Sequence, residues 1–184
     1  KALIEVEFND SLENIYQEFD EEPLAAASIA QVHHARLISG KEVAVKVQRP
    51  GIEKVIGLDL DILSEMAHFF DHHTKYGELY DFSGMVDDFQ KTIQNEMDFM
   101  KEGENADTFL RNFREDEGVT VPKIKWIYTT KRVLTMEYFR GIKISDLEAL
   151  DLAGIDRRKA AERLATSICN QVLRDGFFHA DPHP

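Results

Sequence analysis

The chain has 184 residues, 43% of them hydrophobic, which is enough for one domain with a substantial core. Its 34 acidic and 22 basic side chains give a formal net charge of −12, which argues against generic binding to nucleic acid or anionic lipid. The single cysteine, Cys169, cannot form an internal disulfide, which suits a reducing compartment, and its apolar surroundings predict a buried position. No apolar run approaches the ~20 residues of a membrane-spanning helix, and no signal peptide begins at Lys1.

The first part of the chain predicts a small β-structure. In residues 1–22, the early apolar spacing is compatible with a strand and the later spacing with a short helix. Residues 31–37 and 42–48 are rich in apolar and β-branched residues and flank the turn signal Ser39-Gly40, so they predict an antiparallel hairpin. Lys46 lies on the second strand among valines, where its amine either extends outward or is held by an acidic partner.

Small residues precede this hairpin at a defined spacing. Ala25, Ala27, Ala30 and Val32 match the G-x-G-x-x-G-x-V pattern of the kinase glycine-rich loop, with alanine in place of each glycine. Small residues let the backbone approach phosphates closely, and a lysine within V-A-V-K, here Lys46, contacts the α- and β-phosphates in kinases. The alternative is a helix start followed by a surface lysine, but the loop, hairpin and lysine together favour the kinase-like interpretation.

Two helices are predicted after the lysine strand. The apolar spacing predicts a helix over 52–73, a linker over 74–81, and a longer helix that Ser83 caps and that runs to about residue 114. The second helix carries three acidic residues near one turn: Glu96, Asp98 and Glu102. Because these acids repel one another, we expect a cation beside them, either Lys46, a metal ion, or both. A solvated helix face is the alternative.

A second hairpin is predicted next. Residues 123–128 and 132–137 have strand character and are joined by a short polar turn. The run MEYFRG at 136–141 follows the second strand and is similar to the kinase hinge, where backbone groups hydrogen-bond adenine. The end of an edge strand would show the same residues, so the position of the run after two strands is what favours a hinge.

The remaining residues predict helices followed by a short polar motif. Ser145-Asp146 favours the start of a short helix, and residues 156–174 predict an amphipathic helix that Gly176 ends. The chain closes near His179-Ala180-Asp181, which is similar to the H-x-D of kinase catalytic loops. In that loop the aspartate orients the acceptor and removes its proton.

Together, PLAAASIAQVH at 23–33 and VAVKVQRPG at 43–51 resemble the UbiB family of atypical, kinase-like proteins. The family's E-x-D motif matches residues 96–98, and its H-x-D-P-H-P run matches residues 179–184; its upstream K-x-G-Q signature does not occur in this chain. The resemblance implies an α+β, protein-kinase-like fold. An antiparallel-sheet N-lobe would occupy residues 1–140 with a helical insertion at about 51–114, and residues 141–184 would form the hinge exit and the first C-lobe helices.

The resemblance also implies a function: binding of ATP and Mg²⁺, with hydrolysis or phosphate transfer, in support of ubiquinone or other isoprenoid-lipid metabolism. Lys46, Glu102 and Asp181 would be catalytic, and Glu96 and Asp98 are tentative metal ligands. The nucleotide would contact the loop, the lysine strand and the hinge, at Ala25, Ala26, Ala27, Ser28, Ala30, Val32, Ala44, Lys46, Met136, Glu137 and Phe139.

The same resemblance bears on partners and on the activity of this chain by itself. The implied partners are nucleotide and lipid or quinone-pathway proteins, not nucleic acid. The implied location is cytoplasmic, with membrane attachment only through parts outside this chain. In the family pattern, a metal-binding asparagine and a D-F-G aspartate follow the residue that corresponds to Pro184, so we expect little or no turnover from these residues alone.

Other interpretations stay open. His179, Asp181 and His183 alternate as ligands on a strand would, which allows a metal-dependent hydrolase, and His68 and His72 at i, i+4 allow a zinc site. An aminoglycoside-phosphotransferase-like enzyme shares the H-x-D pattern but does not account for AAASIAQVH or KVQRPG. A pseudokinase scaffold that binds nucleotide without turnover is the third interpretation.

Overall fold

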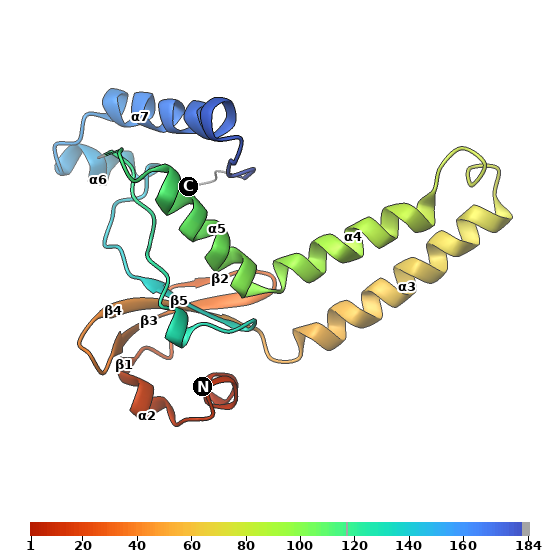
Figure 1. Ribbon diagram of the computed structural model, residues 1–184, viewed down its shortest axis with the longest axis horizontal. Coiled ribbons are helices and arrows are strands. Elements are labelled where there is room, and N and C mark those ends of the chain that lie inside the picture. The colour runs from red at the N-terminus through yellow and green to blue at the C-terminus, as the bar shows by residue number, and fades with distance from the viewer. Residues whose placement is uncertain (117, 182–184) are drawn as a thin grey trace. The chain divides into compact units, whose positions relative to one another are not determined.

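The computed structural model describes residues 1–116 and 118–181, which divide into two compact units. The first unit comprises Lys1–Glu104 and Ile124–Glu137, and the second comprises Asn105–Lys123 and the chain from Tyr138 onward. Residues 105–123 thus group with the second unit, although they were predicted to belong to the N-lobe at residues 1–140. Figure 1 labels the elements of both units.

The first unit is built on a five-stranded antiparallel sheet, in which β1, β3, β4 and β5 are neighbours in that order and β2 pairs with β3. The strands are β1 (Tyr16–Phe19), β2 (Ala25–Ala26), β3 (Ala30–Leu37), β4 (Glu42–Gln48) and β5 (Val133–Glu137). The predicted hairpin of β3 and β4 is confirmed, and Gly40 in its turn has a φ of 80°, which glycine adopts without a steric penalty.

The second predicted hairpin is only half formed. Residues 133–137 form β5, but residues 123–128 contribute one bridge, between Ile124 and Met136, followed by the short 3-10 helix η1 (Trp126–Tyr128). The hydroxyl of Thr129 explains the difference, because it accepts a hydrogen bond from the Thr135 amide at 3.2 Å. A side chain thus takes the place of a partner strand at this position.

The N-terminal segment covers one face of the sheet. Residues predicted as an early strand form the helix α1 (Ala2–Phe8), so that prediction is wrong, and α2 (Leu12–Ile15) leads directly into β1. Asn9, with a φ of 50°, ends α1. The core beneath these helices is apolar and buried; it consists of Ile4, Leu12, Ile15, Tyr16, Ala35, Leu37, Val43, Val45 and Val133.

Two helices are inserted after the lysine strand. The helix α3 (Ile52–His73) has the predicted bounds, and residues 74–81 form the predicted linker to α4 (Phe82–Glu96). Figure 1 shows α3 and α4 as an antiparallel pair that runs away from the sheet. The prediction of one continuous second helix is wrong. The helix α4 ends at Glu96, and a separate helix, α5 (Phe99–Asn112), begins three residues later. Asp98 starts α5, since its side chain accepts from the Met100 amide at 3.1 Å.

The start of α4 is held by two aspartates. Asp81, rather than the predicted Ser83, caps the helix by accepting from the Gly84 amide at 2.8 Å. Asp71 of α3 accepts from the amides of Phe82 and Ser83 at 2.9 and 3.0 Å, and from the Ser83 hydroxyl at 2.5 Å. This carboxylate therefore joins the two helices where the linker reverses the chain.

The Asp71 contacts predict an acid-sensitive tip of the helical pair. Its hydrogen bonds, first that from the Ser83 hydroxyl, hold the pKa of Asp71 below the ordinary value of an aspartate. Because the folded pKa is depressed, the stabilisation is present above the unfolded value and is lost as the pH falls through the folded pKa. The protection of the Phe82 and Ser83 amides against hydrogen exchange, measured relative to the intrinsic rate at each pH, should fall in this acid window. Asp71→Asn should show the reduced protection already at neutral pH.

A matched substitution on the same helix separates this effect from a general loss of charge. Asp61 is exposed on α3, so Asp61→Asn removes the same charge away from the linker. We expect its exchange profile across the acid range to follow that of the unaltered protein. Equal exchange at the Phe82 amide in both variants at neutral pH would contradict the role assigned to Asp71.

The second unit contains α6 (Leu147–Leu152), α7 (Arg157–Asn170) and a final π-helical turn, η2 (Gln171–Asp175). Asp146 and Asp156 cap α6 and α7, and Gly176, with a φ of 61°, ends the helical run as predicted. Cys169 is exposed, so its predicted burial is wrong. The buried residue of α7 is Ser167, and a residue two positions later lies about 200° around the helix. None of the described helices is both long and apolar enough to cross a membrane.

Candidate functional site

One face of the sheet carries Lys46 together with several residues predicted to bind nucleotide. The register pairs Lys46 with Val32 on one side and with Leu134 on the other, and it pairs Ala44 with Met136. Cross-strand partners share a face and alternate residues of a strand do too, so these side chains project together. The residues between them, such as Val43 and Val45, point to the other face and are buried in the core.

Lys46 forms an ion pair with Glu102 of α5. The lysine Nζ lies 2.8 Å from Oε1 and 2.6 Å from Oε2 of Glu102, and 4.9 Å from the centroid of the Phe99 ring. The predicted pairing of Lys46 with an acid of the second predicted helix is therefore confirmed; the partner is Glu102, which lies on the part of that helix that forms α5. The two side chains are 22% and 43% exposed, so water screens the attraction and its main effect is to fix the position of the amine.

The start of α5 is anchored to the sheet and places Glu102. The Phe99 amide donates to the Lys131 carbonyl at 3.0 Å, and the Phe99 side chain is fully buried. Glu102 follows three residues later, about one helical turn, so it lies on the same side of α5 as Phe99. The break in the helix at Asp98 thus sets which carboxylate meets Lys46.

The other two acids of the predicted cluster are arranged differently. Glu96 is exposed at the end of α4, and Asp98 caps α5. Within residues 1–116 and 118–181, no three histidine, cysteine or acidic side chains are placed to hold a metal ion. The assignment of Glu96 and Asp98 to a metal stays a prediction. In the suggested zinc pair, the His72 Nδ1 is committed to the His68 carbonyl at 2.9 Å.

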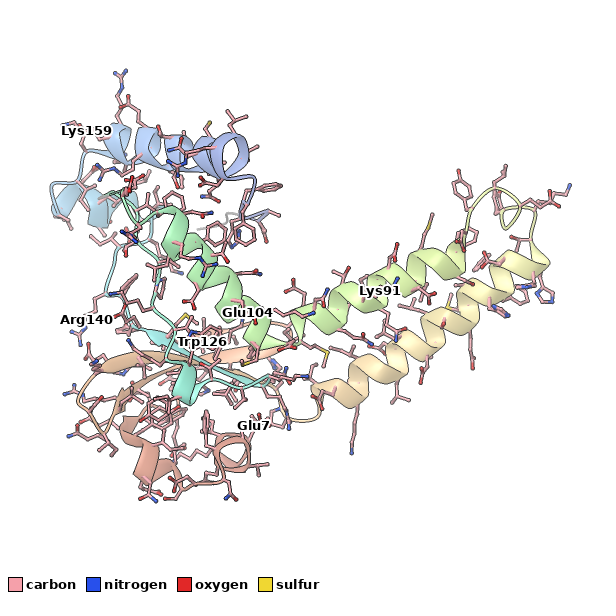
Figure 2. All side chains as sticks on the ribbon, in the orientation of Figure 1. Glu7, Lys91, Glu104, Trp126, Arg140 and Lys159 are labelled. Atoms are coloured by element: carbon pink, nitrogen blue, oxygen red, sulfur yellow. The ribbon has the colours of Figure 1, made fainter. Side chains whose placement is uncertain are left out.

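A glycine lets α5 lie close to the sheet. A Cβ added to Gly103 would lie 2.8 Å from Cη2 of Trp126 and 3.5 Å from Cδ1 of Leu134. Trp126, which Figure 2 labels, lies on η1, and Leu134 is the strand neighbour of Lys46. Gly103 was not among the predicted site residues, although a glycine within an otherwise favourable helical run is a visible signal of close packing.

This contact predicts the outcome of Gly103→Ala. Alanine improves helix propensity by about 1 kcal/mol over glycine, but overpacking against Trp126 typically costs about 1–3 kcal/mol. Gly57→Ala in α3 is the matched control, because an added Cβ there meets no atom within 4 Å. In urea titrations we expect Gly57→Ala to stabilise and Gly103→Ala to fall at least about 1 kcal/mol short of it. An equal gain in stability from both substitutions would show that glycine at position 103 is not needed for the approach of α5 to Trp126.

The alanine loop is a tight hairpin. Ala25 and Ala26 pair with Val32 and Gln31, and the Ala27 amide donates to the Ala30 carbonyl at 2.9 Å. Every residue of this loop has a negative φ, so alanine fits it without backbone strain. Ala25 to Ser28 are exposed, and Ala30 is buried at the base of β3.

Arg49 holds the loop from the end of the lysine strand. Its amide donates to the Ile29 carbonyl at 2.9 Å, and its Nε donates to the Ala27 carbonyl at 3.0 Å. The loop is therefore fixed at two carbonyls by Arg49, which directly follows β4.

The predicted hinge begins where β5 ends. Glu137 pairs with Val43 in the register, so its side chain lies on the sheet face opposite Lys46, and its carboxylate lies 3.5 Å from Nζ of Lys125. The carbonyl of Glu137 stays the predicted adenine contact. Phe139 and Asp181 are exposed and belong to the second unit. In that unit the Asp181 amide donates to Nδ1 of His179 at 3.2 Å; His183 lies outside the described residues.

Known proteins match the chain along its whole length. An uncharacterized protein of Synechocystis sp. is 46% identical over 183 residues, which cover 100% of this chain and 31% of that protein. Protein ACTIVITY OF BC1 COMPLEX KINASE 8, chloroplastic, of Arabidopsis thaliana is 43% identical, with 100% of this chain and 24% of that protein covered. A probable protein kinase UbiB of Marinobacter nauticus is 41% identical, with 100% and 34% covered. The chain spans about a quarter to a third of the length of these relatives.

A solved structure and a family profile agree with these relatives. The Mycobacterium tuberculosis protein Rv3197, solved in complex with erythromycin, matches with a TM-score of 0.68 and 25% identity, covering 83% of this chain and 40% of that one. The predicted α+β, kinase-like fold is therefore confirmed. The profile of the ABC1 atypical kinase-like domain matches residues 1–184, and the chain belongs to this family, which includes the UbiB kinases that it was expected to resemble.

Proposed function

We propose that this domain is the nucleotide-binding part of a UbiB-type atypical kinase or ATPase that binds ATP with Mg²⁺. The observation that carries this proposal is the Lys46–Glu102 ion pair, on the same sheet face as Val32, Ala44 and Met136. In protein kinases the corresponding lysine contacts the α- and β-phosphates while a glutamate of the facing helix holds it. Pairing with Glu102 would hold the Lys46 amine at one position above the sheet before the nucleotide arrives.

The remaining residues of the proposed site have distinct roles. The loop from Ala25 to Ala30 would lie over the phosphates, and Arg49 would keep it from opening. Met136 and the backbone of Glu137 and Phe139 would contact adenine. Asp181 would orient the acceptor hydroxyl or water and take its proton.

The donor set of this chain fits magnesium only as part of a metal–nucleotide complex. Protein sites for Mg²⁺ use one or two carboxylates together with the phosphates of the nucleotide. Glu96 and Asp98 are the carboxylates proposed for this role, although Asp98 already accepts from the Met100 amide. When bound, the ion would neutralise charge on the β- and γ-phosphates. We propose that residues 1–184 alone turn over little ATP, because the further metal ligands of the family pattern follow this stretch.

The proposed cellular role is support of ubiquinone or other isoprenoid-lipid metabolism. The support for it is membership of the ABC1 family and the names of two relatives, a probable protein kinase UbiB and Protein ACTIVITY OF BC1 COMPLEX KINASE 8. Lipids or quinone-pathway proteins are the proposed partners besides nucleotide. We also propose a cytoplasmic location, with membrane attachment only through parts outside this chain; the single cysteine suits such a reducing compartment.

Binding and turnover of radiolabelled ATP by a full-length protein that contains this domain test the proposal. We expect Mg²⁺-dependent binding, followed by release of phosphate or its transfer to a protein or lipid acceptor. Binding without turnover would instead support the pseudokinase scaffold. The absence of both, in a protein shown to be folded, would overturn the proposed function.

A further inference from the structure

A buried amide side chain lies next to the ion pair. Gln48 is 2% exposed and is on β4, two residues after Lys46. Its Nε2 donates to the Met97 carbonyl and, at 3.4 Å, to the Lys131 carbonyl. Burying an amide in a core costs free energy that hydrogen bonds offset. The two contacts satisfy Nε2, whereas Oε1 of Gln48 is buried and has no hydrogen-bond partner among the described residues.

Three chain segments meet at this amide. Besides its side-chain contacts, Gln48 donates its backbone amide to the Arg132 carbonyl at 3.0 Å, and the Phe99 amide donates to the Lys131 carbonyl at 3.0 Å. The Lys131 carbonyl therefore accepts from both β4 and the first residue of α5. Met97, the other acceptor, is the C-cap residue that directly follows α4.

The geometry connects Gln48 to Glu102. Residues two apart on a strand share a face, so Lys46 and Gln48 both lie toward α5. Gln48 holds the backbone just before α5 begins, and Lys46 holds the Glu102 carboxylate about one turn into that helix. β4 thus contacts the chain twice, through Gln48 just before α5 and through Lys46 within α5. The contact of Gln48 sets where α5 begins, and so it sets where Glu102 can meet Lys46.

We infer that Gln48 is a positioning residue of the proposed phosphoryl-transfer site. Its amide fixes the junction of α4 and α5, and this places Glu102 against Lys46. Without the amide, the Met97 carbonyl loses its link to β4, the first turn of α5 moves, and the Lys46–Glu102 pair opens. The consequence for turnover rests on the proposed function, whereas the effect on the ion pair does not.

The experiment measures the reactivity of the Lys46 amine in the full-length protein without nucleotide. An acylating reagent and mass spectrometry give the labelling rate of Lys46, with exposed Lys41 as the internal reference. The Glu102 carboxylate contacts the amine through both oxygens and shields it from the reagent. Gln48→Leu keeps the approximate volume but removes the donor, so we expect Lys46 labelling to rise about tenfold, the scale of losing one such hydrogen bond.

A double-mutant cycle separates positioning from loss of stability. Glu102→Gln alone should raise Lys46 labelling to a similar level, and adding Gln48→Leu to it should raise labelling no further. Thr135→Ala is the matched control, because Thr135 is fully buried in the neighbouring strand on the face opposite Lys46. Removing buried side-chain atoms leaves a cavity, so we expect this variant to lower the urea midpoint while Lys46 labelling stays unchanged.

A second Gln48 variant covers the case in which the first does not fold. If Gln48→Leu does not fold, Gln48→Asn keeps the amide but shortens its reach, and it should give a smaller rise in labelling. Unchanged Lys46 labelling in a folded Gln48 variant, or a rise that adds to that of Glu102→Gln, would overturn the inference. If labelling rises as expected but the protein binds no ATP, the positioning role stands and the proposed function fails.

Discussion

Replacing Phe99 with alanine should lower the free energy of unfolding by about 3–5 kcal/mol, the usual cost of removing a buried aromatic ring. Phe99 is fully buried at the first turn of α5, and its ring lies 4.9 Å from the Lys46 amine. The substitution therefore removes both core packing and one wall of the site. Urea unfolding of a full-length protein that contains the domain, followed by circular dichroism, measures the change.

Two further variants test whether burial is the cause. Phe89 of α4 is 48% exposed, so Phe89→Ala should change the stability by about 0.5 kcal/mol or less. Phe99→Leu keeps most of the apolar volume and should lose clearly less stability than Phe99→Ala. Equal losses for Phe89→Ala and Phe99→Ala would mean that α5 is not anchored by its first residue.

Lys46→Met should reduce ATP turnover by a full-length protein at least about 100-fold, the scale of losing one preorganised contact to developing charge. Methionine keeps much of the stem but cannot contact phosphate oxygens. Because the ion pair is partly exposed, the free energy of unfolding should change by only about 1 kcal/mol or less. The comparison of kcat and KM in steady-state assays shows whether the loss lies in the chemical step or in binding.

Lys41→Met is the matched control for this substitution. Lys41 is exposed in the turn before β4, so its loss changes the net charge equally at a distance from the sheet face. Its turnover should stay within about twofold of the unaltered protein, since a screened surface charge has little effect. If both lysine variants lose activity to the same extent, general charge and not a site at Lys46 explains the effect.

The parts of the fold that depend on local pattern could be predicted from the sequence. The valine-rich run around Lys46 and the turn at Gly40 specify a hairpin, because alternation of side chains allows one buried face. The apolar spacing of α3 gave its bounds, and the aspartate before α7 and the glycine after η2 mark the ends of that helical run. In each case the information lies within a few residues of the element.

The parts that depend on distant contacts could not be predicted. The break between α4 and α5 coincides with hydrogen bonds to the Lys131 carbonyl, which lies over thirty positions later in the chain. The strand predicted at residues 123–128 does not form, because the Thr129 hydroxyl accepts a hydrogen bond from the Thr135 amide. The spacing of apolar residues gives no indication of such a side-chain contact. The place of Gln48 does follow from local pattern, because it lies two residues after Lys46 on β4 and both side chains therefore project from the same face of the sheet.

The central claim is that the Lys46 face of the sheet binds the phosphates of ATP. An acyl-phosphate derivative of ATP tests it directly, because it transfers its acyl group to a lysine that lies beside the bound phosphates. Mass spectrometry of the labelled full-length protein should find the acyl group on Lys46, with labelling suppressed by excess ATP and Mg²⁺. Labelling that excess ATP does not suppress, or that falls on other lysines such as Lys41 while Lys46 stays unlabelled, would contradict the account.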